Sequence, residues 1–136
     1  MKTFLQFHES ALTPSDLKDV EKFADRLFAK LNIDVEFTKH FADRANDPRN
    51  HKQINPAELV RLFKKTFRAH GKQIAQQKGG FEAVLNDIVT DLNLPFVLQW
   101  DAKNHELDLI AKTIMRKKDF KTSDKKYQVE SRTPLI

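Results

Sequence analysis

This chain of 136 residues contains no cysteine, which excludes disulfide bonds, cysteine-based zinc sites and thiol nucleophiles. No apolar run reaches the roughly 18 residues that a membrane-spanning helix needs. The N-terminal residues also lack the apolar centre of a secretory signal. We therefore predict a cytoplasmic protein that does not enter a membrane and that folds as one domain with a buried core.

Several catalytic signatures are missing as well. The chain has no His-Glu-x-x-His pattern and no loop dense in carboxylates, so the sequence predicts no metal site and no cofactor. The pair Gly79-Gly80 lacks the lysine and the helix start of a phosphate-binding loop, which argues against hydrolysis of nucleoside triphosphates. Serine is sparse and does not occur in a nucleophile elbow.

Positive charge is what the chain has in excess, and it is unevenly distributed. The formal net charge is +5, and residues 112–132 carry eight Lys or Arg against three acids. Residues 1–36, in contrast, carry five basic side chains against seven acidic ones. A basic C-terminal third indicates a polyanionic partner, most simply nucleic acid, and a solubilising tail is the alternative.

Helix signals are clear in the first half of the chain. Thr13 followed by Pro14 is typical of a helix start, and apolar residues at helical spacing continue to about Leu31. A second long helix is predicted to begin at Asn55-Pro-Ala-Glu58 and to stop at Gly71. Between them, Thr38 is expected to cap a short helix.

Strand signals follow the helices. Residues 33–37 alternate between apolar and polar, and residues 96–100 and 106–115 are expected to form an antiparallel hairpin. Residues 81–92 fit either a helix or a strand followed by a turn. The order predicts an α+β fold in which N-terminal helices pack on a small antiparallel β-sheet.

The expected domain organisation is simple. A lead-in of residues 1–12 precedes one α+β domain of residues 13–120, and a basic, flexible tail of residues 121–136 follows. No internal repeat is present.

The pair His40 and Arg44 is the leading candidate for chemistry. Four residues apart on a helix, the two side chains lie on one face within reach of one ligand. RNA cleavage that uses the RNA's own 2′-hydroxyl group needs a proton-transfer group and positive charge, but no metal. Strand alternation would place Lys112 and Arg116 on a shared face, where they would complete this site. Further candidates for RNA binding are Arg49, His51, Lys64, Lys117 and Lys118.

A resemblance supports the same hypothesis. The run Thr38-Lys-His40-Phe-Ala-Asp-Arg44-Ala45, followed by Glu58-Leu-Val-Arg-Leu62-Phe63, resembles the RegB-like phage endoribonucleases. Over residues 33–118 the layout is similar to the RelE-like toxin fold. The resemblance implies an RNA-cleaving role for His40 with Arg44 beside it. It also leads us to expect a second histidine after the Leu-Phe pair, where this chain has Lys64.

Two other interpretations stay open. One is a non-catalytic phage-type protein of the same fold that binds a protein or nucleic acid, and residues 1–9 are similar to the leaders of capsid-packaged phage proteins. The other is a toxin whose basic surface is covered by an acidic protein partner, an antitoxin. RNA is the expected partner if the protein is a metal-independent endoribonuclease, and the cleaved ends would then be 2′,3′-cyclic phosphates.

Overall fold

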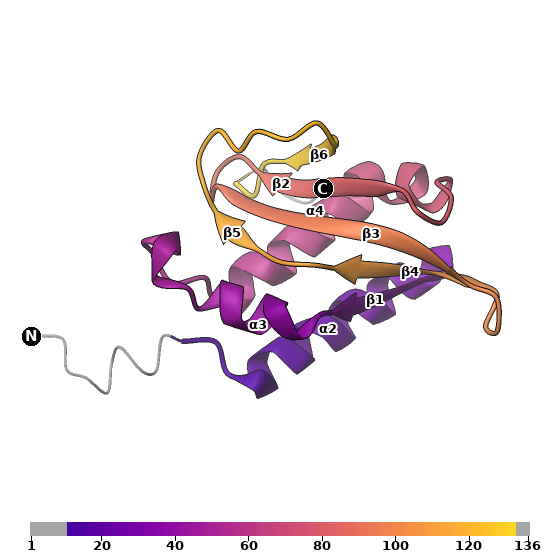
Figure 1. Cartoon of the computed structure of the whole chain (residues 1–136), viewed down its shortest axis with the longest axis horizontal. Coiled ribbons are helices and arrows are strands. Elements are labelled where there is room, and N and C mark those ends of the chain that lie inside the picture. Colours follow the sequence, from indigo (N-terminus) through magenta and orange to yellow (C-terminus); the bar gives the residue numbers. More distant parts are fainter. Residues whose placement is uncertain (1–10, 133–136) are drawn as a thin grey trace, which may run out of the picture.

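Residues 11–132 are described by the computed structural model, and they form three α-helices and a six-stranded sheet. Helices α2 (Pro14–Phe28) and α4 (Pro56–Ala75) lie side by side against one face of the sheet (Figure 1). The short helix α3 (Lys39–Ala45) directly follows the first strand of the sheet. The predicted α+β class is thus confirmed. In this part of the chain, no helix combines the length and the apolar character needed to cross a membrane.

Both long helices begin where the sequence predicts. The Thr13 hydroxyl accepts a hydrogen bond from the Asp16 amide at 3.0 Å, and the Asp16 carboxylate accepts one from the Thr13 amide in return. Such a capping box satisfies two amides that the helix itself leaves unpaired. After α2, the 3-10 turn η1 (Ala29–Leu31) ends at Asn32, which has a positive φ of 60°.

The predicted end of the second long helix is wrong. α4 continues through Gly71 to Ala75, and Gly71 has no positive φ. A Cβ atom at this position would lie 2.8 Å from the Leu31 Cδ1 atom. Gly71 therefore allows close packing between α4 and η1, rather than ending the helix.

The sheet is mixed, which corrects the prediction of a purely antiparallel one. Its strand order is β1-β4-β3-β2-β6, and β5 pairs with β3 beyond the end of β4. The pairs β1–β4 and β2–β6 are parallel, and the others are antiparallel. The alternation of apolar and polar residues within a strand does not reveal whether a neighbouring strand, distant in the sequence, runs parallel or antiparallel to it. The strands are β1 (Ile33–Phe37), β2 (Glu82–Asp87), β3 (Leu92–Asp101), β4 (Glu106–Ala111), β5 (Met115–Arg116) and β6 (Lys125–Val129).

The structure settles the ambiguous segment and corrects the expected tail. Residues 82–87 form strand β2, which is buried on both faces after Glu82 and so lacks the alternation of a half-exposed strand. Residues 125–129 form edge strand β6, anchored by the buried Tyr127 and Val129, instead of a flexible tail. The first ten residues of the lead-in and residues 133–136 lie outside the described part.

The predicted strand over residues 106–115 is split in two. β4 ends at Ala111, Ile114 is buried between the strands, and β5 begins at Met115. Alternation therefore does not continue from Lys112 to Arg116, and the expectation that their side chains share a face is wrong.

Helix α2 is bonded to the free edge of strand β1. The Glu21 carboxylate accepts a hydrogen bond from the Phe37 amide at 2.7 Å. The Asp25 carboxylate accepts one from the Val35 amide at 3.0 Å. The helix thus supplies acceptors to the edge amides that no neighbouring strand pairs.

Candidate functional site

Helix α3 presents the His40–Arg44 pair on a well-anchored support. Phe41 is fully buried and its ring stacks on that of Phe37, with 4.2 Å between the ring centroids. At the N-terminus, Thr38 does not cap the helix with its side chain, because its hydroxyl donates to the Lys112 carbonyl oxygen at 2.8 Å. These contacts tie α3 to the core and to the end of β4, and His40 remains exposed to solvent.

A buried asparagine fixes the segment after α3. The 3-10 turn η2 (Pro48–Asn50) starts at Asp47, whose carboxylate accepts a hydrogen bond from the Arg49 amide. The Asn50 side chain donates to the Arg44 carbonyl oxygen at 2.8 Å and accepts from the Arg116 amide at 2.9 Å. Asn50 thereby holds the end of α3 beside β5.

His51 occupies a strained backbone position directly after this asparagine. Its φ is 64° and its ψ is −43°, and the Lys52 amide donates to the Asn50 carbonyl oxygen at 2.6 Å across it. These features define a γ-turn of the rare, strained type. Such a conformation costs about 1–3 kcal/mol, and strain of this kind is frequent at functional sites.

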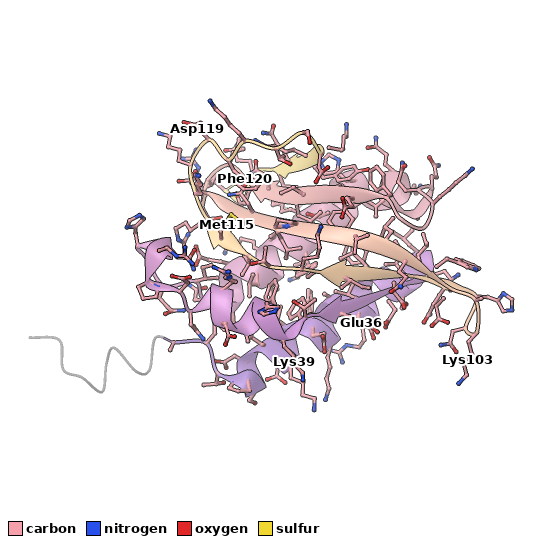
Figure 2. All side chains as sticks on the ribbon, in the orientation of Figure 1. Glu36, Lys39, Lys103, Met115, Asp119 and Phe120 are labelled. Carbon is pink, nitrogen blue, oxygen red and sulfur yellow. The ribbon has the colours of Figure 1, made fainter. Side chains whose placement is uncertain are left out.

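The opposite wall is formed by the segment around β5. The Lys117 amide donates to the Asp91 carbonyl oxygen at 2.8 Å. The Lys117 carbonyl oxygen accepts from the buried Asn93 side chain at 2.9 Å. Met115, labelled in Figure 2, lies on β5.

Between these walls lies a broad, open cleft with a volume of about 1080 Å³. It combines two histidines and five basic residues with two acidic ones. Residues far apart in the sequence therefore meet on one surface. The cleft is lined by His40, Arg44, Asp47, Arg49, Asn50, His51, Asp91, Thr113, Ile114, Met115, Arg116, Lys117 and Lys118.

Asp47 lies between the two arginines of the α3 side. Its carboxylate is 2.8 Å from Arg49 Nη2 and 3.7 Å from Arg44 Nη1. Hydrogen bonds from Arg49 lower the pKa of Asp47 to about 2, so the carboxylate stays ionised under ordinary conditions. Arg44 and Arg49 are nevertheless well exposed, with 50% and 76% of their side chains accessible, and both are available to an anion.

Six of the nine predicted site residues line this cleft in positions open to a ligand. They are His40, Arg44, Arg49, His51, Lys117 and Lys118. The other three, Arg116, Lys112 and Lys64, are placed differently.

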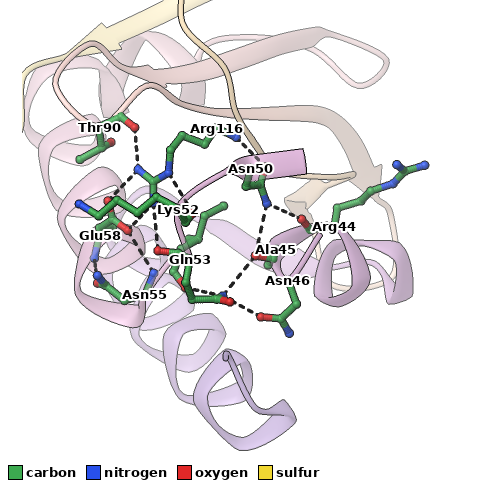
Figure 3. A network of polar contacts seen from close by, with 11 residues as sticks. Arg44, Ala45, Asn46, Asn50, Lys52, Gln53, Asn55, Glu58, Thr90 and Arg116 are labelled. Atoms are coloured by element: carbon green, nitrogen blue, oxygen red, sulfur yellow. Dashed lines mark hydrogen bonds and ion pairs between the residues drawn. The ribbon is translucent and has the colours of Figure 1, made fainter. Parts of the chain in front are cut away.

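Arg116 lines the cleft, but its guanidinium group is occupied elsewhere (Figure 3). It forms a two-point ion pair with the Glu58 carboxylate, with N···O distances of 2.8 and 3.0 Å. It also donates to the carbonyl oxygens of Lys52, Gln53 and Thr90. These bonds use all five N–H groups of the side chain, which is only 11% exposed. Arg116 is therefore a structural residue rather than a phosphate ligand.

Lys112 and Lys64 do not line the cleft. The Lys112 ammonium group pairs with the Glu82 carboxylate on β2 at 2.9 Å, and both side chains are well exposed. The Lys64 ammonium group lies 5.6 Å from the centroid of the Phe23 ring on α2. The predicted catalytic role of Lys112 and the RNA-binding role of Lys64 gain no support from these positions.

Asn50 and Glu58 are site-building residues that the sequence analysis missed. Asn50 follows Asp47-Pro48-Arg49 in a stretch that reads only as a turn. Glu58 is recognisable as part of a capping box, and its carboxylate indeed accepts from the Asn55 amide at 3.1 Å. Nothing in the local sequence signals that the same carboxylate also binds Arg116, 58 positions away.

A separate group of carboxylates lies on β1 and β4. One oxygen each of Asp34, Glu106 and Asp108 lies within 4.8 Å of the others. Burial, a hydrogen bond with Asp25 and the surrounding carboxylates raise the pKa of Asp34 to about 8. Burial also raises the pKa of Asp108. Asp34 therefore keeps its proton near neutral pH.

Asp34 is expected to make the protein less stable as pH rises. An unfolded chain releases this proton near the ordinary pKa of 3.8, whereas the folded protein retains it up to about pH 8. The contribution of protonated Asp34 to the free energy of unfolding is complete below about pH 4 and is lost as pH rises through about 8. Asp34→Asn keeps a hydrogen-bond donor and removes the titration. The loss in free energy of unfolding between acidic and alkaline pH should therefore be smaller by about 1–3 kcal/mol than in the wild type. Urea unfolding at acidic and alkaline pH measures this difference.

The control for this prediction is Asp19→Asn, which changes an exposed carboxylate on α2. That variant should keep the wild-type dependence of stability on pH. An Asp34→Asn protein that declines as steeply as the wild type would contradict the assignment.

No family model, curated protein or solved structure matches this chain.

Proposed function

We propose that this protein binds RNA and cleaves it without a metal ion, with the reacting phosphate held in the cleft. The observation that supports this proposal is the gathering of His40, Arg44, Arg49 and the Lys117–Lys118 pair around one open cleft. The resemblance of residues 33–118 to RegB-like endoribonucleases of the RelE-like fold supports the same function.

The charge of the cleft suits a phosphodiester. Arg116 is neutralised by Glu58, so the basic residues that remain for a ligand are Arg44, Arg49, Lys117 and Lys118. The cleft has two acids, and Asp47 is the one that pairs with Arg49. Arginine binds phosphate oxygens with two parallel hydrogen bonds, which adds geometric selectivity to the charge attraction. The proposed partner is RNA, met in the cytoplasm.

His40 is the proposed proton-transfer group of the reaction. In the cleavage step, the 2′-oxygen loses its proton, forms a bond to phosphorus and displaces the 5′-oxygen, which leaves with a proton. The products are a 2′,3′-cyclic phosphate and a 5′-hydroxyl end, so no water is consumed and no metal is required. His40 moves one of these two protons and solvent water in the open cleft carries the other, while Arg44, one turn away, stabilises the charge of the crowded phosphorane.

The remaining basic residues of the cleft hold the neighbouring phosphates. Arg49 and His51 do so from the α3 side, and Lys117 and Lys118 from the opposite wall. An acidic protein partner such as an antitoxin would compete for the same surface.

The experiment that tests this function is incubation of the purified protein with RNA in the presence of EDTA. Cleavage that leaves 2′,3′-cyclic phosphate and 5′-hydroxyl ends is the expected result. Cleavage that occurs only when a divalent metal is added, or that leaves other ends, would contradict the proposed chemistry.

A second candidate function is RNA binding without cleavage. It is favoured by Lys64, which stands where the family resemblance leads us to expect a second histidine, and by the engagement of Arg116 with Glu58. A folded protein that binds RNA in EDTA but never cleaves it would establish this alternative.

A further inference from the structure

A row of lysines continues from the rim of the cleft. Lys117 and Lys118 line the cleft itself. The connection to β6 and the start of that strand add Lys121, Lys125 and Lys126, against the acids Asp119 and Asp124. We call Lys121, Lys125 and Lys126 the outer lysines.

The fold carries this row away from the cleft. β5 pairs with β3, whereas β6 pairs with β2 on the other side of β3. The chain between them therefore passes from the cleft across the end of β2 to the far edge of the sheet (Figure 1). Asp119 and Phe120 lie on this passage, beyond Met115 along the chain (Figure 2).

The backbone beneath the row is held in place at both ends. Lys117 is bonded through its amide and its carbonyl oxygen to Asp91 and Asn93. At the other end, Tyr127 is 2% exposed and paired in register with Leu85 of β2. Because Lys125 and Lys126 are consecutive on β6, their side chains point to opposite faces, and the outer lysines flank this edge of the sheet on a fixed support.

No carboxylate neutralises the outer lysines within residues 11–132, where the ion pairs involve other cations. Two of them lie over aromatic rings instead. The Lys125 ammonium group is 5.7 Å from the centroid of the Tyr127 ring, and that of Lys126 is 6.0 Å from the Phe120 ring. Positive charge combined with a partly exposed ring such as Phe120 is typical of surfaces that follow a nucleic-acid strand.

We infer that the outer lysines form a second binding surface, which holds the phosphates that flank the reacting one. This inference rests on the proposed function, because it assumes that the cleft holds RNA. None of the outer lysines lines the cleft, so we expect them to act on flanking phosphates rather than on the reacting one. They should therefore affect the binding of long RNA and leave the chemical step unchanged.

The test compares long and minimal substrates in a triple variant. The matched control removes three exposed lysines from α2 and from the β3–β4 turn. The outer variant is Lys121→Gln/Lys125→Gln/Lys126→Gln, and the control is Lys18→Gln/Lys22→Gln/Lys103→Gln. Binding is measured with a 2′-O-methyl oligonucleotide, which cannot be cleaved, over a series of salt concentrations. Cleavage is measured on a dinucleoside phosphate, which has only one phosphodiester.

The outer variant is expected to bind the oligonucleotide about tenfold more weakly than the control. The slope of log K against log salt should fall by about 2, since each lost contact to a single strand removes about 0.7. Cleavage of the dinucleoside phosphate should match the wild type in kcat and KM. Replacing the same three lysines by arginine should preserve binding, which separates charge from folding.

Three outcomes would overturn the inference. They are unchanged oligonucleotide binding in the outer variant, weakening no greater than in the control, and a loss of dinucleotide cleavage in a folded outer variant. Failure of the proposed function is distinguishable from these. If the wild type binds the oligonucleotide through the outer lysines but cleaves no RNA, the proposed cleavage is wrong and the inferred binding surface is supported. A wild type that binds no oligonucleotide would overturn both.

Discussion

His40→Ala is expected to slow RNA cleavage by about 10²–10⁴-fold, the usual contribution of a positioned acid or base. Binding of a 2′-O-methyl oligonucleotide should change little, because the phosphates are held by Arg44, Arg49 and the lysines of the opposite wall. The side chain of His40 is exposed, so the substitution should leave the fold intact. Single-turnover cleavage in EDTA, with binding measured in parallel, separates the two effects.

The control for this experiment is His105→Asn. His105 is exposed in the turn between β3 and β4, and its φ of 53° is one that asparagine tolerates. This variant should cleave RNA at the wild-type rate. Equal rates for His40→Ala and the wild type would exclude His40 from the reaction and return it to a surface role.

Arg116→Ala is expected to destabilise the protein by about 3–5 kcal/mol, as in other cases in which one member of a buried ion pair is removed. The substitution leaves the Glu58 carboxylate, which is only 12% exposed, without its cation. It also removes the donor that Arg116 supplies to the carbonyl oxygens of Lys52, Gln53 and Thr90. Urea unfolding of the variant and the wild type measures the loss.

Lys112→Ala provides the matched comparison. Its ion pair with Glu82 has a similar N···O distance of 2.9 Å, but both side chains are well exposed. Exposed pairs contribute about 0–1 kcal/mol, so this variant should remain close to the wild type in stability. Similar losses in the two variants would show that the bonds around Arg116 do not act as a buried network.

Local patterns explain how much of the fold was predictable. The starts of α2 and α4 were correct because Thr13 and Asn55 each bond to groups within the next turn. The His40–Arg44 pair was recognisable for the same reason, since both residues lie on one short helix. Features of this kind depend on a few adjacent residues and can be read without knowledge of the fold.

The errors all involve partners distant in sequence. Gly71 was interpreted as a helix end because its packing against Leu31 is invisible in the sequence. Arg116 was interpreted as a phosphate ligand because a basic residue near a strand gives no sign of its partner, Glu58. Strand alternation wrongly predicts that Arg116 and Lys112 share a face, because the strand is interrupted around the buried Ile114.

The bonds from α2 to β1 also bear on how the protein associates with itself. A strand with free amides at the edge of a sheet is a template on which another chain can add a strand. Glu21 and Asp25 accept from two of those amides, and the helix that carries them covers that edge. Addition of a strand to β1 therefore requires α2 to detach first. As long as this helix stays docked, it protects the protein from fibre-like growth at that edge.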